Sequence, residues 1–166
     1  DVFMEAGYEV KKREVHGMAQ GGGSVSTHVR FGPKVYSPLI KEGEVDIFMA
    51  FEELEALRYL SYLSPRATIL MNEQRLTPPA VALGTEDYPA DVKQVLSSRA
   101  GKFVSLPARY LALRAGDVRA VNVVLLGALQ SILSLPEKVW TDQILRRFPP
   151  KAGPINLEAF RLGQKG

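Results

Sequence analysis

Glycines and polar side chains that suit ligand binding gather in one stretch of this chain, residues 14–30. Three consecutive glycines permit positive φ angles and let a ligand or a second backbone approach closely. The candidate binding residues are these glycines and the polar residues around them: His16, Gln20, Gly21, Gly22, Gly23, Ser24 and Arg30. The guanidinium offers five donors in a planar fork that matches carboxylate or phosphate. The stretch therefore predicts a turn between two strands that is either plain or the edge of a binding site for an anion or a partner.

No catalytic set stands out among the reactive residue types. Ser24, His28 and Asp46 could form a nucleophile set, but no nucleophile-elbow pattern surrounds the serine. His16 and His28 lack a carboxylate at metal-ligand spacing, so we interpret both as structural. The carboxylates within residues 52–55 fall in the first turn of a predicted helix, where the helix dipole alone favours them. We expect neither a catalytic residue nor a metal ligand in this chain.

Composition limits the function classes further. The 166 residues include no cysteine, so the chain has no thiolate nucleophile and no cysteine ligands for an iron–sulfur cluster. A formal net charge of +3 without long basic blocks does not indicate nucleic acid binding. No apolar run is long enough to span a bilayer, and no signal-peptide pattern is present. We therefore expect a cytoplasmic protein that binds neither nucleic acid nor a membrane.

Predicted strands alternate with predicted helices along the chain, which indicates an α/β fold. A length of 166 residues predicts a single domain over residues 1–166, large enough to bury a core. The predicted strands cover residues 8–15, 24–31, 34–39, 45–51, 68–71 and 103–106. The predicted helices are a first one that ends near Gly7 and then residues 52–63, 93–98, 107–113, 118–133, 136–148 and 157–162.

Three finer expectations accompany these elements. Gly32-Pro33 sets a turn that should pair residues 24–31 with residues 34–39 as a hairpin. The Pro-rich segment 72–91 should be irregular, with at most a short strand near Val81. The helix over 118–133 is apolar nearly all round and should be buried, so Asn122 within it should need a hydrogen-bond partner.

Residue order makes a family resemblance visible. The first segments that carry it are His16-Gly-Met-Ala-Gln-Gly-Gly-Gly-Ser-Val, His28-Val-Arg-Phe-Gly and Val35-Tyr-Ser-Pro-Leu-Ile. The later ones are Glu44-Val-Asp-Ile-Phe-Met-Ala-Phe-Glu-Glu-Leu-Glu-Ala-Leu-Arg58 and Asn122-Val-Val-Leu-Leu-Gly-Ala-Leu129. In this order they resemble the gamma subunit of the 2-oxoacid:ferredoxin oxidoreductases, and within that family the indolepyruvate branch. The resemblance covers most of residues 7–162. One position departs from the pattern, because Gly21 stands where the family usually carries Arg.

The resemblance implies a three-layer α/β sandwich with a mixed, mostly parallel sheet, like domain III of pyruvate:ferredoxin oxidoreductase. It implies one subunit of a complex that converts a 2-oxoacid such as indolepyruvate, coenzyme A and oxidised ferredoxin into acyl-CoA, carbon dioxide and reduced ferredoxin. Thiamine diphosphate and the iron–sulfur clusters are expected on a large partner subunit, and ferredoxin is expected to interact through the complex. The candidate binding residues would border coenzyme A or the partner, and the isolated chain would be inactive.

Two further expectations remain open at this point. The family resemblance implies a strand and a Gly-rich turn before Asp1, and we expect a vacancy beside the strand at 8–15 or at 45–51. The rival hypothesis for function is a free-standing α/β module that binds a small anion at the Gly-rich turn without a catalytic partner. Copurification with a large thiamine-dependent chain would separate the two hypotheses.

Overall fold

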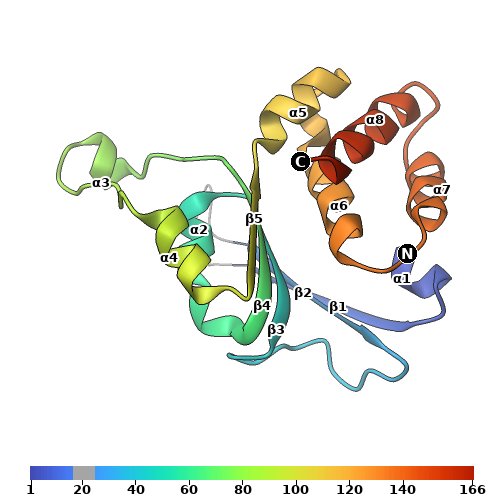
Figure 1. Ribbon diagram of the computed structural model, residues 1–166, viewed down its shortest axis with the longest axis horizontal. Helices are drawn as coiled ribbons and strands as arrows, with labels where there is room; N and C mark the ends of the chain where they lie inside the picture. The colour runs from blue at the N-terminus through green and yellow to red at the C-terminus, as the bar shows by residue number, and fades with distance from the viewer. Residues whose placement is uncertain (17–24) are drawn as a thin grey trace.

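A three-stranded parallel sheet lies at the centre of the molecule (Figure 1). The structure is a computed structural model that describes residues 1–16 and 25–166. The strands are β3 (Val45–Ala50), β4 (Leu63–Asn72) and β5 (Lys102–Leu106), in the order β3-β4-β5. Ile69, Leu70 and Met71 of the central strand are fully buried, as expected for a strand that is covered on both faces.

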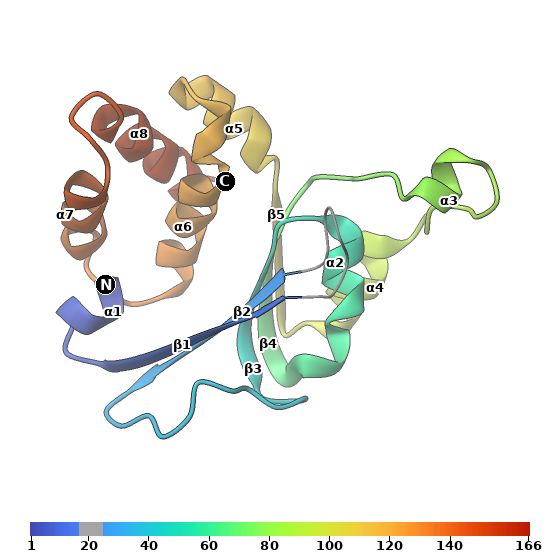
Figure 2. The ribbon, with the colours of Figure 1, turned by 180° about the vertical axis from the view of Figure 1, so that it is seen from behind.

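Helices cover both faces of this sheet. Alternate residues of β4 point to opposite sides, so neighbouring residues contact different helical layers. Ile69 and Met71 pack on one side with α2 (Glu53–Arg58) and α4 (Val92–Arg99). Leu70 packs on the other side with α5 (Ala108–Ala115), α6 (Val121–Ile132) and α8 (Gly153–Gln164). Seen from behind in Figure 2, the sheet again separates the two groups of helices. The predicted three-layer α/β class is confirmed.

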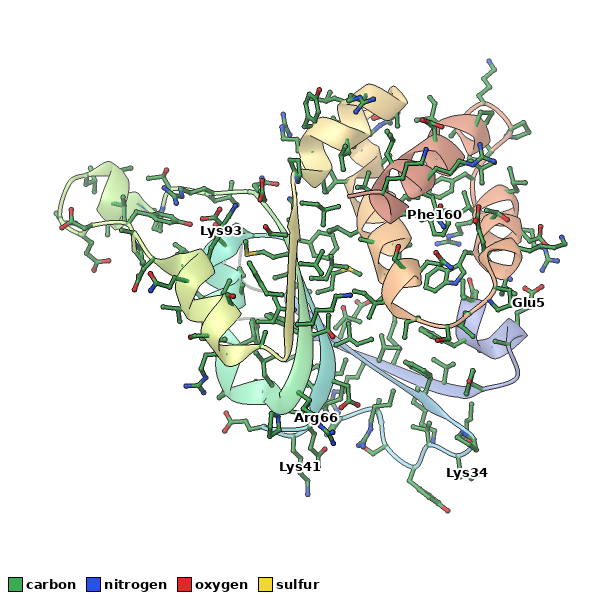
Figure 3. All side chains as sticks on the ribbon, in the orientation of Figure 1. Glu5, Lys34, Lys41, Arg66, Lys93 and Phe160 are labelled. Carbon is green, nitrogen blue, oxygen red and sulfur yellow. The ribbon has the colours of Figure 1, made fainter. Side chains whose placement is uncertain are left out.

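Two helices of the larger layer touch backbone to backbone. A Cβ atom on Gly127 of α6 would overlap the carbonyl of Phe160 in α8, and a Cβ atom on Gly163 of α8 would overlap the carbonyl of Val124 in α6. Glycine is the residue that allows helix axes to approach this closely. Phe160 itself is fully buried and points into the helical layer in Figure 3. The layer also contains the 3₁₀ turn η2 (Val118–Ala120) and α7 (Glu137–Arg147).

A separate antiparallel pair is formed by β1 (Glu9–His16) and β2 (Val25–Gly32). The short helix α1 (Val2–Glu5) precedes it, and Gly7 turns the chain with φ +87°. The Phe3 ring stacks on Phe31 of β2 at 3.9 Å between centroids and lies edge-on to Trp140 of α7 at 6.2 Å. This aromatic contact ties the strand pair to the helical layer.

The predicted hairpin between residues 24–31 and 34–39 is wrong. The strand β2 pairs with β1 over its whole length, from Glu9 opposite Gly32 to His16 opposite Val25, and residues 34–39 form no strand. Proline has no N–H for a strand ladder, which disfavours pairing at Pro33 and Pro38. The Ser37 hydroxyl instead accepts a hydrogen bond from the Leu39 amide at 3.2 Å, a local turn that competes with a strand.

Other local predictions differ from the structure in detail. The Pro-rich segment 72–91, predicted to be irregular with at most a short strand near Val81, instead contains the short helix α3 (Pro79–Ala82), which begins with a proline at its first helical position. Asn122 is exposed on α6, so it needs no buried partner. The predicted helix over 52–63 divides into α2 and the 3₁₀ turn η1 (Leu60–Tyr62). None of the helices in the described ranges combines the length and hydrophobicity that crossing a bilayer demands.

Candidate functional site

The Gly-rich stretch connects β1 to β2. His16 ends β1 and pairs with Val25 at the start of β2, so the connecting segment leaves and re-enters at one end of the strand pair. Residues 17–24 lie outside the described residues, and the predicted roles of Gln20, Gly21, Gly22, Gly23 and Ser24 fall there.

Arg30 lies toward the other end of the same pair. It is opposite Lys11, five positions from Val25 along β2, which corresponds to about 17 Å of strand. Its Nη1 donates to the Leu39 carbonyl at 3.0 Å, and its Nη2 lies 4.0 Å from the Glu44 carboxylate. The guanidinium therefore holds the segment that follows β2 in place. It does not lie at the end of the strand pair that contains Val25.

His28 contributes to the same fastening. Its Nδ1 accepts a hydrogen bond from the Ile40 amide at 3.2 Å, and its ring lies edge-on to Tyr62 with 6.0 Å between centroids. A nitrogen that accepts a hydrogen bond is not free to bind a metal or a nucleophile's proton. The described parts of the chain hold no group of three His, Cys, Asp or Glu residues that could bind a metal ion.

An apolar cavity of about 500 Å³ opens between the strand pair, the parallel sheet and α6. Its wall includes residues 25–29 of β2, residues 47–51 at β3, and Leu126, Leu129 and Leu133 at α6. Consecutive residues of a strand point to opposite faces of its sheet. Since residues 47–51 all line this one cavity, the cavity runs along the edge of β3 rather than over one face of the sheet. In residues 1–16 and 25–166, that edge of β3 has no paired strand. The cavity thus offers backbone groups as well as apolar side chains.

The carboxyl ends of the parallel strands carry a polar network that the sequence did not reveal. This is the edge where open α/β sheets commonly bind ligands. The Asn72 side chain is 1% exposed; its Oδ1 accepts from the Ala108 amide at 3.1 Å and its Nδ2 donates to the Phe51 carbonyl at 3.1 Å. It joins the ends of all three strands. The sequence feature that could have identified Asn72 is its position as a polar residue at the end of the apolar run of β4.

Glu52 belongs to the same network. One oxygen, Oε2, accepts from the amides of Leu54 at 2.8 Å and Glu55 at 3.0 Å and so caps the N-terminus of α2. The other, Oε1, accepts from the Leu76 amide at 3.1 Å. The structural role predicted for the carboxylates within residues 52–55 is confirmed for Glu52.

The remaining charges at this edge are paired. Glu73 accepts from Lys93 of α4 at 2.6 Å and from the Ser105 hydroxyl at 2.9 Å, and the Lys93 contact holds the pKa of Glu73 below its ordinary value (Figure 3). Arg75 lies 3.3 Å from the Glu53 carboxylate and 4.1 Å from the centre of the Tyr88 ring. Burial, followed by the nearby glutamates, raises the pKa of Tyr88. These contacts hold the strand ends together.

Comparison with known proteins gives a consistent family. The sequence model described as "Pyruvate ferredoxin/flavodoxin oxidoreductase" matches residues 1–165. Indolepyruvate oxidoreductase subunit IorB from Pyrococcus horikoshii is 40% identical over 167 residues, covering 98% of this chain and 83% of the relative. The protein of the same name from Thermococcus kodakarensis is 39% identical with the same coverage.

Solved structures share the fold. The gamma subunit of a keto/oxoacid ferredoxin oxidoreductase from Geobacter sulfurreducens matches with a TM-score of 0.68 and 19% identity, covering 98% of this chain and 82% of that one. Pyruvate oxidoreductase subunit PORC from Thermotoga maritima matches with a TM-score of 0.68 and 18% identity, covering 99% and 83%. The resemblance drawn from the sequence is confirmed, and the chain belongs to the pyruvate ferredoxin/flavodoxin oxidoreductase family.

Proposed function

We propose that this chain is the gamma-type subunit of a thiamine-dependent oxidoreductase that decarboxylates indolepyruvate or a related arylpyruvate. The products are an acyl-CoA, carbon dioxide and reduced ferredoxin. The observation that carries the proposal is the 40% identity to an indolepyruvate oxidoreductase subunit over 98% of the chain. We place the complex in the cytoplasm and treat residues 1–166 as a single domain.

The cofactors are proposed to reside on a large partner subunit. Bound thiamine diphosphate would supply carbanion chemistry, and iron–sulfur clusters would take single electrons. The chain's own residues do not fit a cluster, because the sequence has no cysteine. The polar network at the sheet edge is internally paired. The contribution of this chain is therefore assembly and shaping of the complex rather than a reacting group.

The Gly-rich stretch is proposed as the edge that meets the partner or coenzyme A. His16, Gln20, the three glycines and Ser24 would supply close backbone approach and polar contacts there. Arg30 would act by holding the segment with Leu39 and Glu44 in place beside β2.

The test is reconstitution. The chain and the large thiamine-binding subunit are expressed separately and together, and viologen reduction is measured with indolepyruvate and coenzyme A. We expect turnover only from the copurified pair, with arylpyruvates preferred over pyruvate and 2-oxoglutarate. Turnover by the chain alone, or full activity of the large subunit without it, would disprove the proposal. A chain that binds a small anion but never copurifies would favour the free-standing module.

A further inference from the structure

The segment that joins β2 to β3, residues 33–44, runs beside the strand pair without forming a strand of its own (Figure 1). We call this segment the strap. Side chains of the strand pair hold it: Lys11 Nζ donates to the Tyr36 carbonyl at 3.3 Å, and Arg30 Nη1 donates to the Leu39 carbonyl at 3.0 Å. Each of these contacts is therefore a separate point of attachment.

One attachment of the strap lies in the wall of the apolar cavity. Ile40 of the strap lines this cavity together with His28 and Tyr62. The Ile40 amide donates to Nδ1 of His28 at 3.2 Å, and the bond is partly buried. The His28 ring in turn lies edge-on to Tyr62, with 6.0 Å between centroids. The hydrogen bond between His28 and Ile40 thus holds this part of the cavity wall in place.

This attachment requires a neutral imidazole. A ring nitrogen accepts a hydrogen bond only while it carries no proton, and an imidazolium has two donors and no acceptor. A proton on Nδ1 of His28 would point at the Ile40 N–H group and leave that amide without its acceptor. Histidine side chains commonly change charge between about pH 5 and 8. The attachment is therefore of a kind that mild acid breaks.

Charged and titratable groups face His28 from the elements packed against it. Arg13 lies opposite His28 on β1, and Arg30 is two residues further along β2 on the same face. Their guanidinium groups repel a further positive charge, and Glu44 of the strap, 4.0 Å from Arg30, offsets part of this repulsion. The other titratable groups belong to the cavity wall: Glu52, Glu55, Tyr59 and Tyr62. Glutamate and tyrosine ordinarily titrate outside the range of histidine.

We propose that His28 is an acid-sensitive latch for the strap. With a neutral ring, the latch is closed and Ile40 is part of the cavity wall. With a protonated ring, the Ile40 amide loses its acceptor and the strap loosens at this end of the cavity. The contacts of Lys11 and Arg30 do not depend on a proton in this range, so the loosening is local to the residues from Ile40 onward. The proposal does not depend on the proposed function.

The first experiment measures hydrogen exchange of single amides by NMR, with each rate divided by the intrinsic rate at its pH. In the wild-type chain, protection of the Ile40 amide should fall about 5-fold between about pH 7.5 and about pH 5.5, as expected for loss of one hydrogen bond of about 1 kcal/mol. The Leu39 amide donates to the Ser37 hydroxyl and should keep its protection. Amides of β4 report global unfolding and should also be unchanged.

Three variants test the role of the ring. His28→Asn offers an amide oxygen in place of Nδ1 and does not titrate, so protection of Ile40 should not depend on pH. His28→Ala removes the acceptor and should lower protection of Ile40 at both pH values. His16→Gln removes the other histidine of the sequence and is the matched control. Its Ile40 amide should respond to pH as in the wild-type chain.

A label on the strap provides a second measurement. The sequence has no cysteine, so Lys41→Cys gives a single attachment point for an environment-sensitive dye; Lys41 is labelled in Figure 3. Dye emission should change between the two pH values, and this change should vanish when His28→Asn is added. The same dye at Glu158→Cys, an exposed position on α8, corrects for the response of the dye itself to pH.

The outcomes decide the proposal. Protection of Ile40 that is equal at both pH values, or that falls as much in His28→Asn as in the wild-type chain, would overturn it. A fall that disappears in His16→Gln would assign the effect to the other histidine and also overturn it. Loss of protection at Ile40, Leu39 and β4 together would show general unfolding in place of a latch.

Discussion

At the scale of single residues, the Glu52 carboxylate links α2 to the segment that follows β4. Its two oxygens accept hydrogen bonds from three backbone amides, two in the first turn of α2 and that of Leu76 after β4. These hydrogen bonds are partly buried, and a donor that is shielded from water and loses its acceptor keeps the cost of its desolvation.

We therefore expect Glu52→Ala to lower the free energy of unfolding by about 2–4 kcal/mol, from the lost helix cap and the unpaired amide of Leu76. Glu52→Gln keeps one carbonyl oxygen and should cost about half as much. Urea unfolding monitored by circular dichroism measures both, with Glu86→Gln as a control at an exposed carboxylate. Equal stabilities for Glu52→Ala and the control would refute this role.

Glu73 should make stability depend on acidity. Its pKa in the folded chain is lowered, first by the hydrogen bond from Lys93. A lowered folded-state pKa stabilises the fold above the unfolded value, about 4.3, and that contribution disappears as pH falls through the folded pKa. The wild-type chain should therefore exceed Glu73→Gln in urea midpoint at pH 7 and lose this advantage on acidification to pH about 3. A constant difference between the two proteins across that range would contradict the assignment.

At the scale of elements, the seam between α6 and α8 depends on two glycines. An alanine methyl at Gly127 would overlap the Phe160 carbonyl, and one at Gly163 would overlap the Val124 carbonyl. Overpacking a filled core typically costs about 1–3 kcal/mol, and backbone atoms give way less readily than side chains.

Gly127→Ala and Gly163→Ala should each lower the melting temperature clearly, since the two helices must separate to admit a methyl group. Gly32→Ala is the control, because a Cβ there would meet only the Lys34 carbonyl at 3.8 Å. Differential scanning calorimetry of the three variants provides the comparison. An unchanged melting temperature for Gly127→Ala would show that the seam is loose.

Sequence patterns predicted the elements better than their pairing. Periodicity and turn chemistry are local, so the predicted helix over 107–113 lies within two residues of the observed bounds of α5 at both ends. Two segments could pair with β2, namely β1 and residues 34–39. The turn residues Gly32-Pro33 favoured residues 34–39, but β2 pairs with β1. Asn72 was not identified because its hydrogen bonds join residues 51 and 108, far apart in sequence.

The candidate site was predictable only in part. Residue types drew attention to Arg30 and His28, but spacing could not show that both are engaged by the segment after β2. The family was predicted from the order of several motifs along the chain and not from any reactive group.

At the scale of the whole molecule, a chain of rings joins the strand pair to the core. Phe31 stacks on Phe3, Phe3 meets Trp140, and Trp140 lies 6.1 Å from Phe160. Glu5 adds a polar link from α1 to Arg146 of α7 at 3.1 Å (Figure 3). The described part of the strand pair is thereby held against the helical layer at the α1 end.

Phe3→Ala should release this attachment. We expect faster hydrogen exchange in β1 and β2 and a loss of about 2–4 kcal/mol in unfolding free energy, while amides of β4 keep their relative protection. Tyr36→Ala, which removes an exposed ring, is the control. Uniformly faster exchange across the sheet and the strand pair would instead indicate that the two parts unfold together.

The ring chain also gives the protein a built-in optical reporter. Trp140 is the only tryptophan in the sequence, and it is buried two ring contacts from β2. Indole emission responds to the polarity and quenching groups around the ring, so a shift of the strand pair that parts Phe3 from Trp140 changes its wavelength or intensity. Movement of the strand pair at the α1 end can therefore be followed by intrinsic fluorescence, without a dye.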